Sequence, residues 1–237
     1  MKKMKGIQVL KKMGFWIKNL ILTLFILSLF LVLLYKYTPI YYTSYMLVAN
    51  AKQVFSGHKP HIRHEWKPLS EISPQLPKAI IASEDYLFLI HNGFDSDNEN
   101  VQFNRGARIL YQKNLTITQQ TARNIFLPPG ETFLTKLMET YFTILIELVW
   151  GKERIMEAYL NSIQMGKDIY GAEAAAQAYY AIPANDINIA EAAGIAACLI
   201  NPADLNPCEP NIYLLRRQAK IRNIMEDMIE IQWKQED

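Results

Sequence analysis

The N-terminal segment constrains the chain most, because residues 19–35 (NLILTLFILSLFLVLLY) contain no charged side chain. Extending this run back to Phe15 gives 21 residues with Lys18 as the only charge. About 20 apolar residues span a bilayer as an α-helix, and a lysine near one end of the helix can reach the interface. The sequence therefore predicts a cytoplasmic tail over residues 1–14 and a transmembrane helix over residues 15–35.

Charge on the two sides of this helix predicts its orientation. Residues 1–36 contain seven lysines and no acidic residue, and only Lys36 follows the apolar run closely. Because positively charged flanks stay in the cytoplasm, we expect a single-pass protein of the cytoplasmic (inner) membrane with its body outside, in the periplasm or its equivalent. Tyrosines after the run suit the outer interface: they are Tyr35, Tyr37, Tyr41, Tyr42 and Tyr45.

A cleavable signal peptide is the alternative interpretation, because Ala49-Asn50-Ala51 resembles a cleavage site. That site lies far beyond the apolar run, so the sequence favours a retained anchor. We also expect membrane lipids to contact several apolar side chains at the start of the body. These are Ile40, Tyr41, Tyr42, Tyr45 and Met46.

The remaining residues form an acidic body with 18 basic and 23 acidic side chains. This balance argues against a nucleic-acid partner. The two cysteines lie in different surroundings, Cys198 in an apolar helical stretch and Cys208 in a proline-rich loop. We therefore predict two unpaired thiols, even for a body outside the cytoplasm.

Residues 36–65 are predicted to connect the membrane helix to the body. The connector contains three of the four histidines, His58, His61 and His64. A metal site built from these histidines is disfavoured, because no cysteine or fourth ligand falls at a useful spacing.

Beyond the connector the sequence predicts a mainly α body, since almost no β-type alternation is visible. Pro77 suits the first residue of a helix that continues through Ile90, and the polar stretch Asp95–Lys113 predicts a loop. Further helices are expected within residues 114–127, over 132–150, over 152–163, over 188–200 after an Asn188–Glu191 capping box, and from Ile212 to Trp233.

The helix over residues 132–150 has a mainly apolar face from which Glu139 is displaced. This face is predicted from its helical spacing. Its members are Leu134, Leu137, Met138, Tyr141, Phe142, Leu145, Leu148 and Val149.

Two adjacent carboxylates, Glu84 and Asp85, interrupt the most apolar part of the body (IIASEDYLFLI). A carboxylate in apolar surroundings is costly to ionise, and such sites are often functional. An apolar neighbourhood is expected to raise the pKa of Glu84 toward the working pH.

This stretch resembles the first motif of the peptidoglycan glycosyltransferases, glycosyltransferase family 51. The motif reads Glu84-Asp85-x-x-Phe88-x-x-His91-x-Gly93 here. Four further motifs follow in the family's order: Thr116-Ile117-Thr118-Gln119-Gln120 with Arg123-Asn124, Thr135-Lys136-x-x-Glu139, Lys152-x-x-Ile155-x-x-x-Tyr159-Leu160-Asn161, and Arg216-Arg217. The resemblance covers about Trp66 to Met225, leaves no room for a transpeptidase domain, and so suggests a monofunctional member with its glycosyltransferase domain over residues 66–237.

The resemblance implies a lysozyme-like fold and polymerisation of lipid II, with the growing glycan strand on undecaprenyl pyrophosphate as donor. Glu84 would act as general base on the acceptor 4-hydroxyl, and Glu139 would assist the leaving group by donating a proton or by holding a cation, such as Mg²⁺ or Mn²⁺. Arg123 and Lys136 would contact the pyrophosphate. The other implied substrate-binding residues are Asp85, Phe88, His91, Thr116, Gln119, Gln120 and Asn124. Other cell-wall synthesis proteins are expected as partners.

Three departures from the family's motifs bear on the leaving-group step. Lys113 and Leu115 replace a glycine and a serine of the second motif, Arg123 replaces a lysine, and Thr135 replaces an arginine. These changes remove two donors to phosphate oxygens, although Lys113 is placed to supply one.

Two other classes of function therefore stay open. A degenerate member would bind the lipid-linked precursor or a wall protein as a scaffold, and a lytic enzyme would use the same acid to cleave glycan. Individual residues also have structural interpretations. His91 is then a hydrogen-bonding residue, Glu147 and Lys152 a solvated pair, Tyr159 and Leu160 core residues, and Asn161 a cap.

Overall fold

The computed structural model describes residues 2–95 and 115–233, with side chains from residue 12 onward. Two compact units divide the chain, residues 1–38 and 39–237. The predicted loop at Asp95–Lys113 lies almost entirely outside the described residues.

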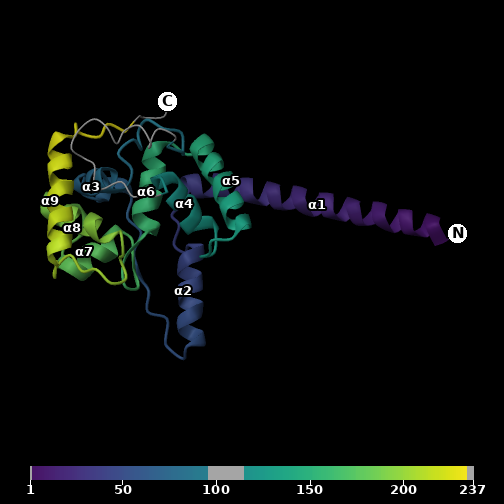
Figure 1. Cartoon of the computed structure of the whole chain (residues 1–237), viewed down its shortest axis with the longest axis horizontal. Helices are drawn as coiled ribbons and strands as arrows, with labels where there is room; N and C mark the ends of the chain where they lie inside the picture. The colour runs from purple at the N-terminus through teal and green to yellow at the C-terminus, as the bar shows by residue number, and fades with distance from the viewer. Residues whose placement is uncertain (1, 96–114, 234–237) are drawn as a thin grey trace. The chain divides into compact units, whose positions relative to one another are not determined.

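The first unit is one long helix, α1 (Lys2–Tyr37) (Figure 1). Its stretch Lys12–Tyr37 is long and apolar enough to cross a membrane, judged by length and composition. Large apolar side chains are exposed along this stretch, including Trp16, Ile21 and Phe30. The structure thus contains the helix that the sequence predicts, and the predicted span 15–35 falls inside it.

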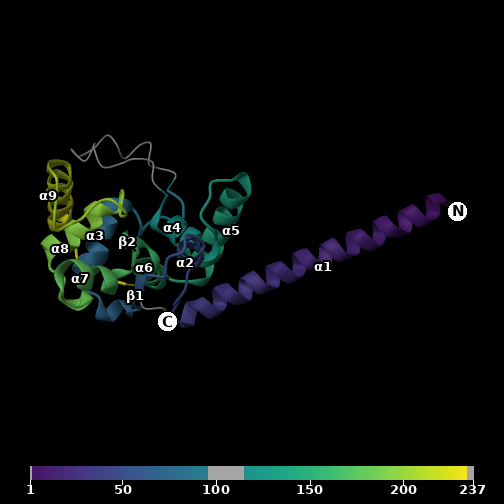
Figure 2. The ribbon, with the colours of Figure 1, turned by 90° about the horizontal axis from the view of Figure 1, so that it is seen from below.

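The second unit is mainly α-helical, as predicted. Figures 1 and 2 show two groups of helices, with α3, α8 and α9 in one group and α4, α5 and α6 in the other. The helices of this unit are α2 (Ser44–Phe55), α3 (Gln75–Glu84), α4 (Ile117–Phe126), α5 (Phe133–Val149), α6 (Lys152–Ser162), α7 (Ala172–Tyr180), α8 (Ile189–Cys198) and α9 (Ile212–Asp227), with short 3-10 turns η1 (Leu69–Glu71) and η3 (Ala184–Asp186).

A small sheet joins distant parts of this unit. Its strands are β1 (Arg63–His64), β2 (Gln164–Gly166) and β3 (Ile169–Tyr170), in the order β1-β3-β2. Strand β1 runs parallel to β3, with Arg63 opposite Ile169, and β2 runs antiparallel to β3. Strands of two or three residues are too short to show an alternating pattern, so the sequence did not predict them.

The core confirms several predictions. Tyr159 and Leu160 are fully buried. The predicted capping box is present, because the Asn188 side chain accepts hydrogen bonds from the first turn of α8 and the Glu191 carboxylate accepts one from the Asn188 backbone N–H. Cys198 and Cys208 are both free thiols.

The connector differs from the prediction, because it contains helix α2. Thr43 begins this helix by accepting a hydrogen bond from the Met46 backbone at 3.2 Å. Ile40 and Met46 are each 1% exposed, so their predicted contact with lipid is wrong, whereas Tyr41 and Tyr42 are well exposed.

Helix α3 also differs from the prediction, since it begins at Gln75 and ends at Glu84 instead of continuing through Ile90. Asp85 leaves the helical conformation, with φ −158°. Its side chain is bound to the start of another helix, as described below. Helix α9 is likewise shorter than predicted, because Met228 is already extended.

Helix α5 presents an unexpected face to the core. Its buried residues are Glu139, Phe142, Thr143 and Ile146. The buried and exposed faces both contain apolar residues, which is why the spacing alone did not distinguish them. Five large apolar side chains of α5 are exposed, and we call them the outer stripe: Phe133, Leu134, Leu137, Ile144 and Leu148.

Candidate active site

Glu84 is the last residue of α3, and its side chain is only 6% exposed. Burial raises the pKa of its carboxyl to about 7, from an ordinary value of 4.5. The charge of Arg217 and a hydrogen bond from Gln120 oppose this rise, and the neighbouring charge of Asp85 adds to it. A carboxylate with a pKa near neutrality is suited to accept a proton.

Arg217 contacts Glu84 from α9, with Nη2 at 3.4 Å from Oε1. Its side chain is 5% exposed, and its Nε has no hydrogen-bond partner within the described residues. Arg216 points outward and is exposed. The motif resemblance included both arginines without distinguishing the buried one from the exposed one. A sharper signal was present, because Arg217 shares the buried face of α9 with Leu214 and Ile221.

Gln120 approaches Glu84 from α4. Its Nε2 donates to the Leu115 carbonyl at 2.9 Å and lies 3.4 Å from Oε2 of Glu84. Its Oε1 accepts a hydrogen bond from the hydroxyl of Tyr159 at 3.3 Å. Gln120 therefore holds a fixed orientation with its amide nitrogen toward the carboxylate.

Arg123 lies one turn after Gln120 on α4 and faces the second candidate carboxylate. Its Nη1 lies 3.9 Å from Oε2 of Glu139 on α5. Arg123 also donates to the Gly130 carbonyl at 2.9 Å and lies 3.6 Å from Glu131. Because residues three apart are neighbours on a helix surface, one face of α4 contacts both Glu84 and Glu139.

Glu139 is 9% exposed at its side chain. Burial raises the pKa of this carboxyl, and the charges of Arg123 and Lys136 oppose the rise. Lys136, one turn before Glu139 in the sequence, by itself favours the ionised form. The net direction is upward, so burial outweighs both cations.

The third motif offers one exposed cation and one neutral hydroxyl. Lys136 is exposed on the first turns of α5. Thr135, in place of the family's arginine, donates its hydroxyl to the Thr132 carbonyl at 2.8 Å. The positive charges that act on Glu139 are therefore those of Arg123 and Lys136.

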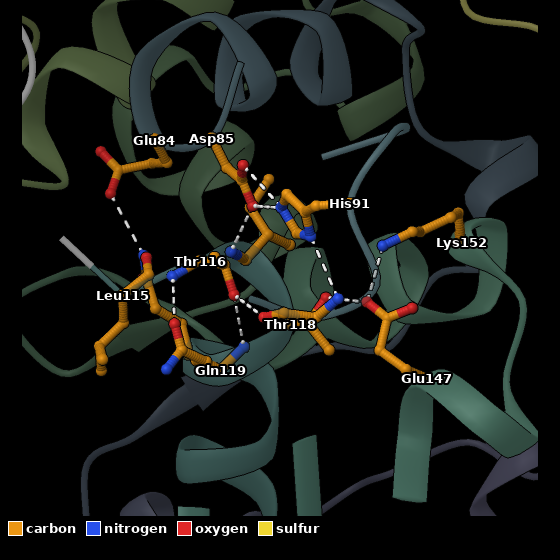
Figure 3. A network of polar contacts seen from close by, with 12 residues as sticks. Glu84, Asp85, His91, Leu115, Thr116, Thr118, Gln119, Glu147 and Lys152 are labelled. Carbon is orange, nitrogen blue, oxygen red and sulfur yellow. Dashed lines mark hydrogen bonds and ion pairs between the residues drawn. The ribbon is translucent and has the colours of Figure 1, made fainter. Parts of the chain in front are cut away.

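Asp85 has different hydrogen-bond partners from its neighbour Glu84. Both carboxylate oxygens lie 2.9 Å from Nε2 of His91, and Oδ2 accepts the backbone N–H of Ile117 at 2.9 Å (Figure 3). His91 Nδ1 accepts the backbone N–H of Gly93 at 3.1 Å, which assigns the ring proton to Nε2. Asp85 thus joins the turn after α3 to the first turn of α4.

Thr116 and Gln119 form a capping box at the start of α4. The Thr116 hydroxyl also donates to the Gly93 carbonyl at 2.6 Å. The hydrogen-bonding groups of Thr116, and the side-chain oxygen of Gln119, are engaged within the protein.

Lys152 and Glu147 contact the turn that follows α3, at Phe88 and Gly93. Nζ of Lys152 is 2.6 Å from Oε1 of Glu147 and 4.7 Å from the centre of the Phe88 ring. The Thr118 hydroxyl donates to the same Glu147 oxygen at 2.6 Å. Glu147 is 10% exposed and Lys152 is 22% exposed, so the interpretation as a solvated pair is wrong. Phe88 itself is completely buried.

Gly93 is required for this arrangement on two grounds. Its φ is +85°, a conformation that side chains rarely adopt, and a Cβ atom would lie 2.9 Å from Cγ of Glu147 and 3.0 Å from Cγ2 of Thr143. The turn of the first motif therefore packs directly against α5.

Asn124 is buried on α4 and lines a cavity of about 160 Å³ together with Gln120, Tyr159 and Tyr170. Glu84 and Glu139 are not among the residues that line it. Asn161 binds both the N–H and the carbonyl of Lys67, at 2.9 Å and 2.8 Å. Asn161 therefore ties α6 to the segment before α3 and does more than cap a helix.

The described part of the chain does not contain a complete set of ligands for a divalent cation. No group of three or more His, Cys, Asp or Glu side chains converges there. Glu139 offers one carboxylate beside the positive charge of Arg123. Mg²⁺ commonly uses one or two carboxylates together with substrate phosphates, so the protein alone does not define such a site.

Comparison with known proteins identifies the family of the chain. Residues 51–228 match the family model described as Transglycosylase. A protein of Bacteroides thetaiotaomicron named biosynthetic peptidoglycan transglycosylase is 43% identical over 224 residues, which cover 91% of this chain and 88% of that protein.

Two further proteins with the same name are similar to the chain. One, from Bdellovibrio bacteriovorus, is 42% identical over 91% of this chain and 86% of its own length. Another, from Shewanella oneidensis, is 34% identical over 98% of this chain and 97% of its own length. These matches confirm the family that the motifs predicted, with its mainly α, lysozyme-like domain. The chain belongs to the transglycosylase family.

Proposed function

We propose that the protein polymerises lipid II into peptidoglycan glycan strands at the outer face of the cytoplasmic membrane. The observation that carries the proposal is the buried Glu84, whose pKa of about 7 suits a general base. Family membership and the names of the similar proteins support a peptidoglycan transglycosylase in general. Lipid II as substrate, and the roles of individual residues, are our proposal.

In the proposed reaction, Glu84 takes the proton from the 4-hydroxyl of the acceptor sugar. The oxygen then attacks the anomeric carbon of the donor strand, and the bond from that carbon to undecaprenyl pyrophosphate breaks. Configuration inverts, from an α-linked leaving group to a β-linked product. A well-placed general base contributes on the order of 100-fold to 10,000-fold to such a rate.

Glu139 is proposed to assist the leaving group. Burial raises the pKa of this carboxyl, which favours a protonated side chain that donates to the pyrophosphate. Arg123 and Lys136 supply positive charge for the same group. The common contact of Glu84 and Glu139 with one face of α4 supports a single site in which base and leaving group act on opposite sides of the reacting carbon.

The neighbouring residues of the first two motifs are proposed to position this site. Asp85, His91 and Thr116 connect the turn after Glu84 to the start of α4, which carries Gln120 and Arg123. Because their polar groups are bound within the protein, we assign them to support of Glu84 rather than to direct substrate contact. Phe88 packs on Lys152 and has the same supporting role.

The scaffold and lytic alternatives are less favoured. A scaffold has no need for a buried carboxylate whose ionisation is costly. A lytic enzyme that acts on finished polymer needs neither an apolar anchor nor the basic groups of Arg123 and Lys136. Both alternatives remain outcomes of the following test.

The test gives the full chain fluorescent lipid II and compares wild type with Glu84→Gln and with Glu153→Gln. Glu153 is an exposed acid at the start of α6, so its variant is the matched control. We expect polymer from wild type and control and a loss of at least about 100-fold in Glu84→Gln. Equal polymer from Glu84→Gln, or none from wild type, contradicts the proposal.

A second arm separates the lytic alternative. The same proteins are incubated with preformed fluorescent glycan in the absence of lipid II. We expect the length of the glycan to stay constant. Shortening by wild type without synthesis of new polymer selects the lytic function instead.

A further inference from the structure

The cavity that Asn124 lines contains polar groups without a partner in the protein. Asn124 and Tyr170 both line it and are only 8% and 5% exposed. Within residues 2–95 and 115–233, neither the side-chain amide of Asn124 nor the hydroxyl of Tyr170 has a hydrogen-bond partner. These polar atoms keep accessible surface, unlike Nε of Arg217, so a ligand can reach them. Buried polar groups are nearly always hydrogen-bonded, so this pair indicates a binding site.

The cavity has a neutral lining. No charged side chain is among the described residues that line it. Burial raises the pKa of Tyr170, so its phenol stays protonated at neutral pH. A phosphate or an ammonium ion would lose its hydration here without gaining a counter-charge. The cavity is therefore suited to a neutral polar group.

Hydrogen-bonding groups and an apolar wall are combined in this lining. The Asn124 amide offers both a donor and an acceptor, and the Tyr170 hydroxyl can serve as either. Ile163, Leu199 and Pro202 supply the apolar wall. An acetamido group has one N–H, one carbonyl oxygen and one methyl group, so it complements all parts of this lining.

The size of the cavity agrees with such a group. Its volume is about 160 Å³. An engineered cavity of about 150 Å³ in another protein holds a benzene molecule. An acetamido group together with one edge of its sugar ring therefore fits, whereas a complete disaccharide does not.

Gln120 connects the cavity to the proposed base. This residue lines the cavity, and its Nε2 lies 3.4 Å from Oε2 of Glu84. The lining does not include Arg123, Lys136 or Glu139, which are proposed to act on the leaving group. The cavity therefore lies on the side of the base, where the proposed reaction requires the acceptor sugar.

Part of the lining comes from the connector. Tyr45, in the first turn of α2, lines the cavity. Helix α2 is held against α4 at this point, because the Ser44 hydroxyl donates to the Ile125 carbonyl at 3.0 Å. The ring of Tyr45 adds apolar area next to the amide of Asn124 and the hydroxyl of Tyr170. The cavity is thus completed by a residue that belongs to no motif of the family.

We propose that this cavity binds the 2-acetamido group of the acceptor sugar. The acetamido N–H and carbonyl pair with Asn124 and Tyr170, and its methyl group lies against the apolar wall. Carbons 2 and 4 of the sugar are separated by one ring carbon, so this placement directs the 4-hydroxyl toward Glu84. The choice of an acceptor sugar rests on the proposed function. The proposal makes Tyr170 and Tyr45 residues that select the substrate.

The test measures binding of a soluble sugar to the full chain in a non-ionic detergent, with no donor present. N,N′-diacetylchitobiose is the probe, and cellobiose, which has hydroxyls in place of the acetamido groups, is the comparison. Saturation-transfer NMR over a range of concentrations gives both affinities. We expect the probe to bind about tenfold more tightly than cellobiose, and its acetamido methyl protons to be the most strongly saturated.

Two variants remove the polar groups with little change of shape. Asn124→Leu and Tyr170→Phe should each weaken binding of the probe by about threefold to tenfold, because a hydrogen bond to the sugar is lost. Neither should lower Tm, since each removes a buried polar group that the described protein does not pair. Asn223→Leu and Tyr213→Phe change exposed residues of α9 and should leave the affinity unchanged.

A structural role of the two residues predicts the opposite pattern, with a lower Tm and unchanged affinity for the probe. That pattern would overturn the proposal. If Asn124→Leu does not fold, Tyr170→Phe decides the result, because it removes a single oxygen atom.

A third sugar distinguishes an acceptor from a donor. Methylation of the terminal 4-hydroxyl of the probe should weaken binding, because this hydroxyl is placed at Glu84. Equal binding of the methylated probe would overturn the assignment to the acceptor and indicate a donor sugar in the cavity. Absence of binding by the probe, or equal binding of cellobiose, would show that no acetamido site exists.

These measurements do not depend on turnover. A chain that binds the probe as expected but makes no polymer from lipid II would contradict the proposed function alone. A chain that makes polymer without preferring the probe over cellobiose would contradict the acetamido site alone.

Discussion

Nη2 of Arg217 lies 3.4 Å from Oε1 of Glu84, although 133 positions separate the two residues in the chain. Helix α9 thereby places a buried guanidinium against a buried carboxylate. Burial raises the pKa of Glu84, and the charge of Arg217 limits the rise to about 7. A base with this pKa is partly ionised at neutral pH and still accepts a proton effectively.

Replacement of Arg217 should move the pH dependence of the reaction. In Arg217→Gln the opposing charge is lost, so the pKa of Glu84 rises and the acidic limb of kcat/KM moves to higher pH. We expect activity to fall by roughly tenfold at pH 7 and to recover partly at pH 8.5. Polymerisation of fluorescent lipid II across this range measures the effect.

Arg216→Gln is the control, because Arg216 is the adjacent exposed arginine. Its profile should match wild type. An equal loss of activity by Arg217→Gln at every pH would argue for a structural role of Arg217 alone.

Glu84 should reduce the stability of the folded protein at alkaline pH. Its folded pKa lies above its ordinary value of 4.5, so the folded state holds the proton more tightly than the unfolded state. The tighter binding of this proton stabilises the folded state fully below pH 4.5, and this contribution is lost as pH rises through 7. Glu84→Gln removes this dependence and should stabilise the protein by about 2 kcal/mol at pH 8 relative to wild type.

Thermal or urea unfolding at pH 5 and pH 8 measures this difference. Glu153→Gln should show the same pH dependence as wild type. A Glu84→Gln protein that is less stable than wild type at pH 8 would show that the ionised carboxylate contributes net stabilisation.

Glu139→Gln tests departure of the leaving group. The amide fills the same space but neither donates a carboxyl proton nor carries charge. We expect kcat to fall by about 100-fold with a small change in KM, because the lost interaction belongs to the transition state. Steady-state rates over a range of lipid II concentrations give both constants, and a change confined to KM would assign Glu139 to binding.

Lys152 and Glu147 should behave as a coupled pair. Lys152→Met leaves the carboxylate of Glu147 largely buried without its cation and should lower the free energy of unfolding by about 2 kcal/mol. The double variant Lys152→Met/Glu147→Gln should recover part of this loss. A double-mutant cycle from urea unfolding measures the coupling, and strict additivity would contradict a direct interaction.

Gly93→Ala should be far more harmful than Gly130→Ala. A Cβ at Gly93 meets Glu147 and Thr143 and requires a positive φ, whereas a Cβ at Gly130 meets no atom within 4 Å. We expect Gly93→Ala to lower the free energy of unfolding by about 2 kcal/mol and to reduce polymerisation, because the turn after Glu84 shifts. Unfolding and activity measured on both variants test this, and equal behaviour would contradict the packing described.

The sequence predicted the helical class, the anchor helix and several helix bounds because those features depend on local patterns. Thr116 with Gln119 and Asn188 with Glu191 are capping pairs that can be read directly from their spacing. The family resemblance also marked both candidate carboxylates. The pKa of Glu84 agrees with the apolar setting that its neighbours in sequence indicated.

Features that depend on distant contacts were not predictable in this way. The end of α3 at Glu84 follows from the bond between Asp85 and Ile117, which lie 32 positions apart. The burial of Glu139 depends on which side of α5 meets α4, and both sides carry apolar residues. Arg217 was recognised as part of a motif, but only the packing of α9 on α3 brings it to Glu84.

The outer stripe of α5 has a practical consequence for handling the protein. Phe133, Leu134, Leu137, Ile144 and Leu148 remain uncovered in the second unit itself, so removal of residues 1–38 would not yield a freely water-soluble catalytic fragment. Such a truncated form should self-associate in plain buffer and become monodisperse only when amphiphiles coat this helix.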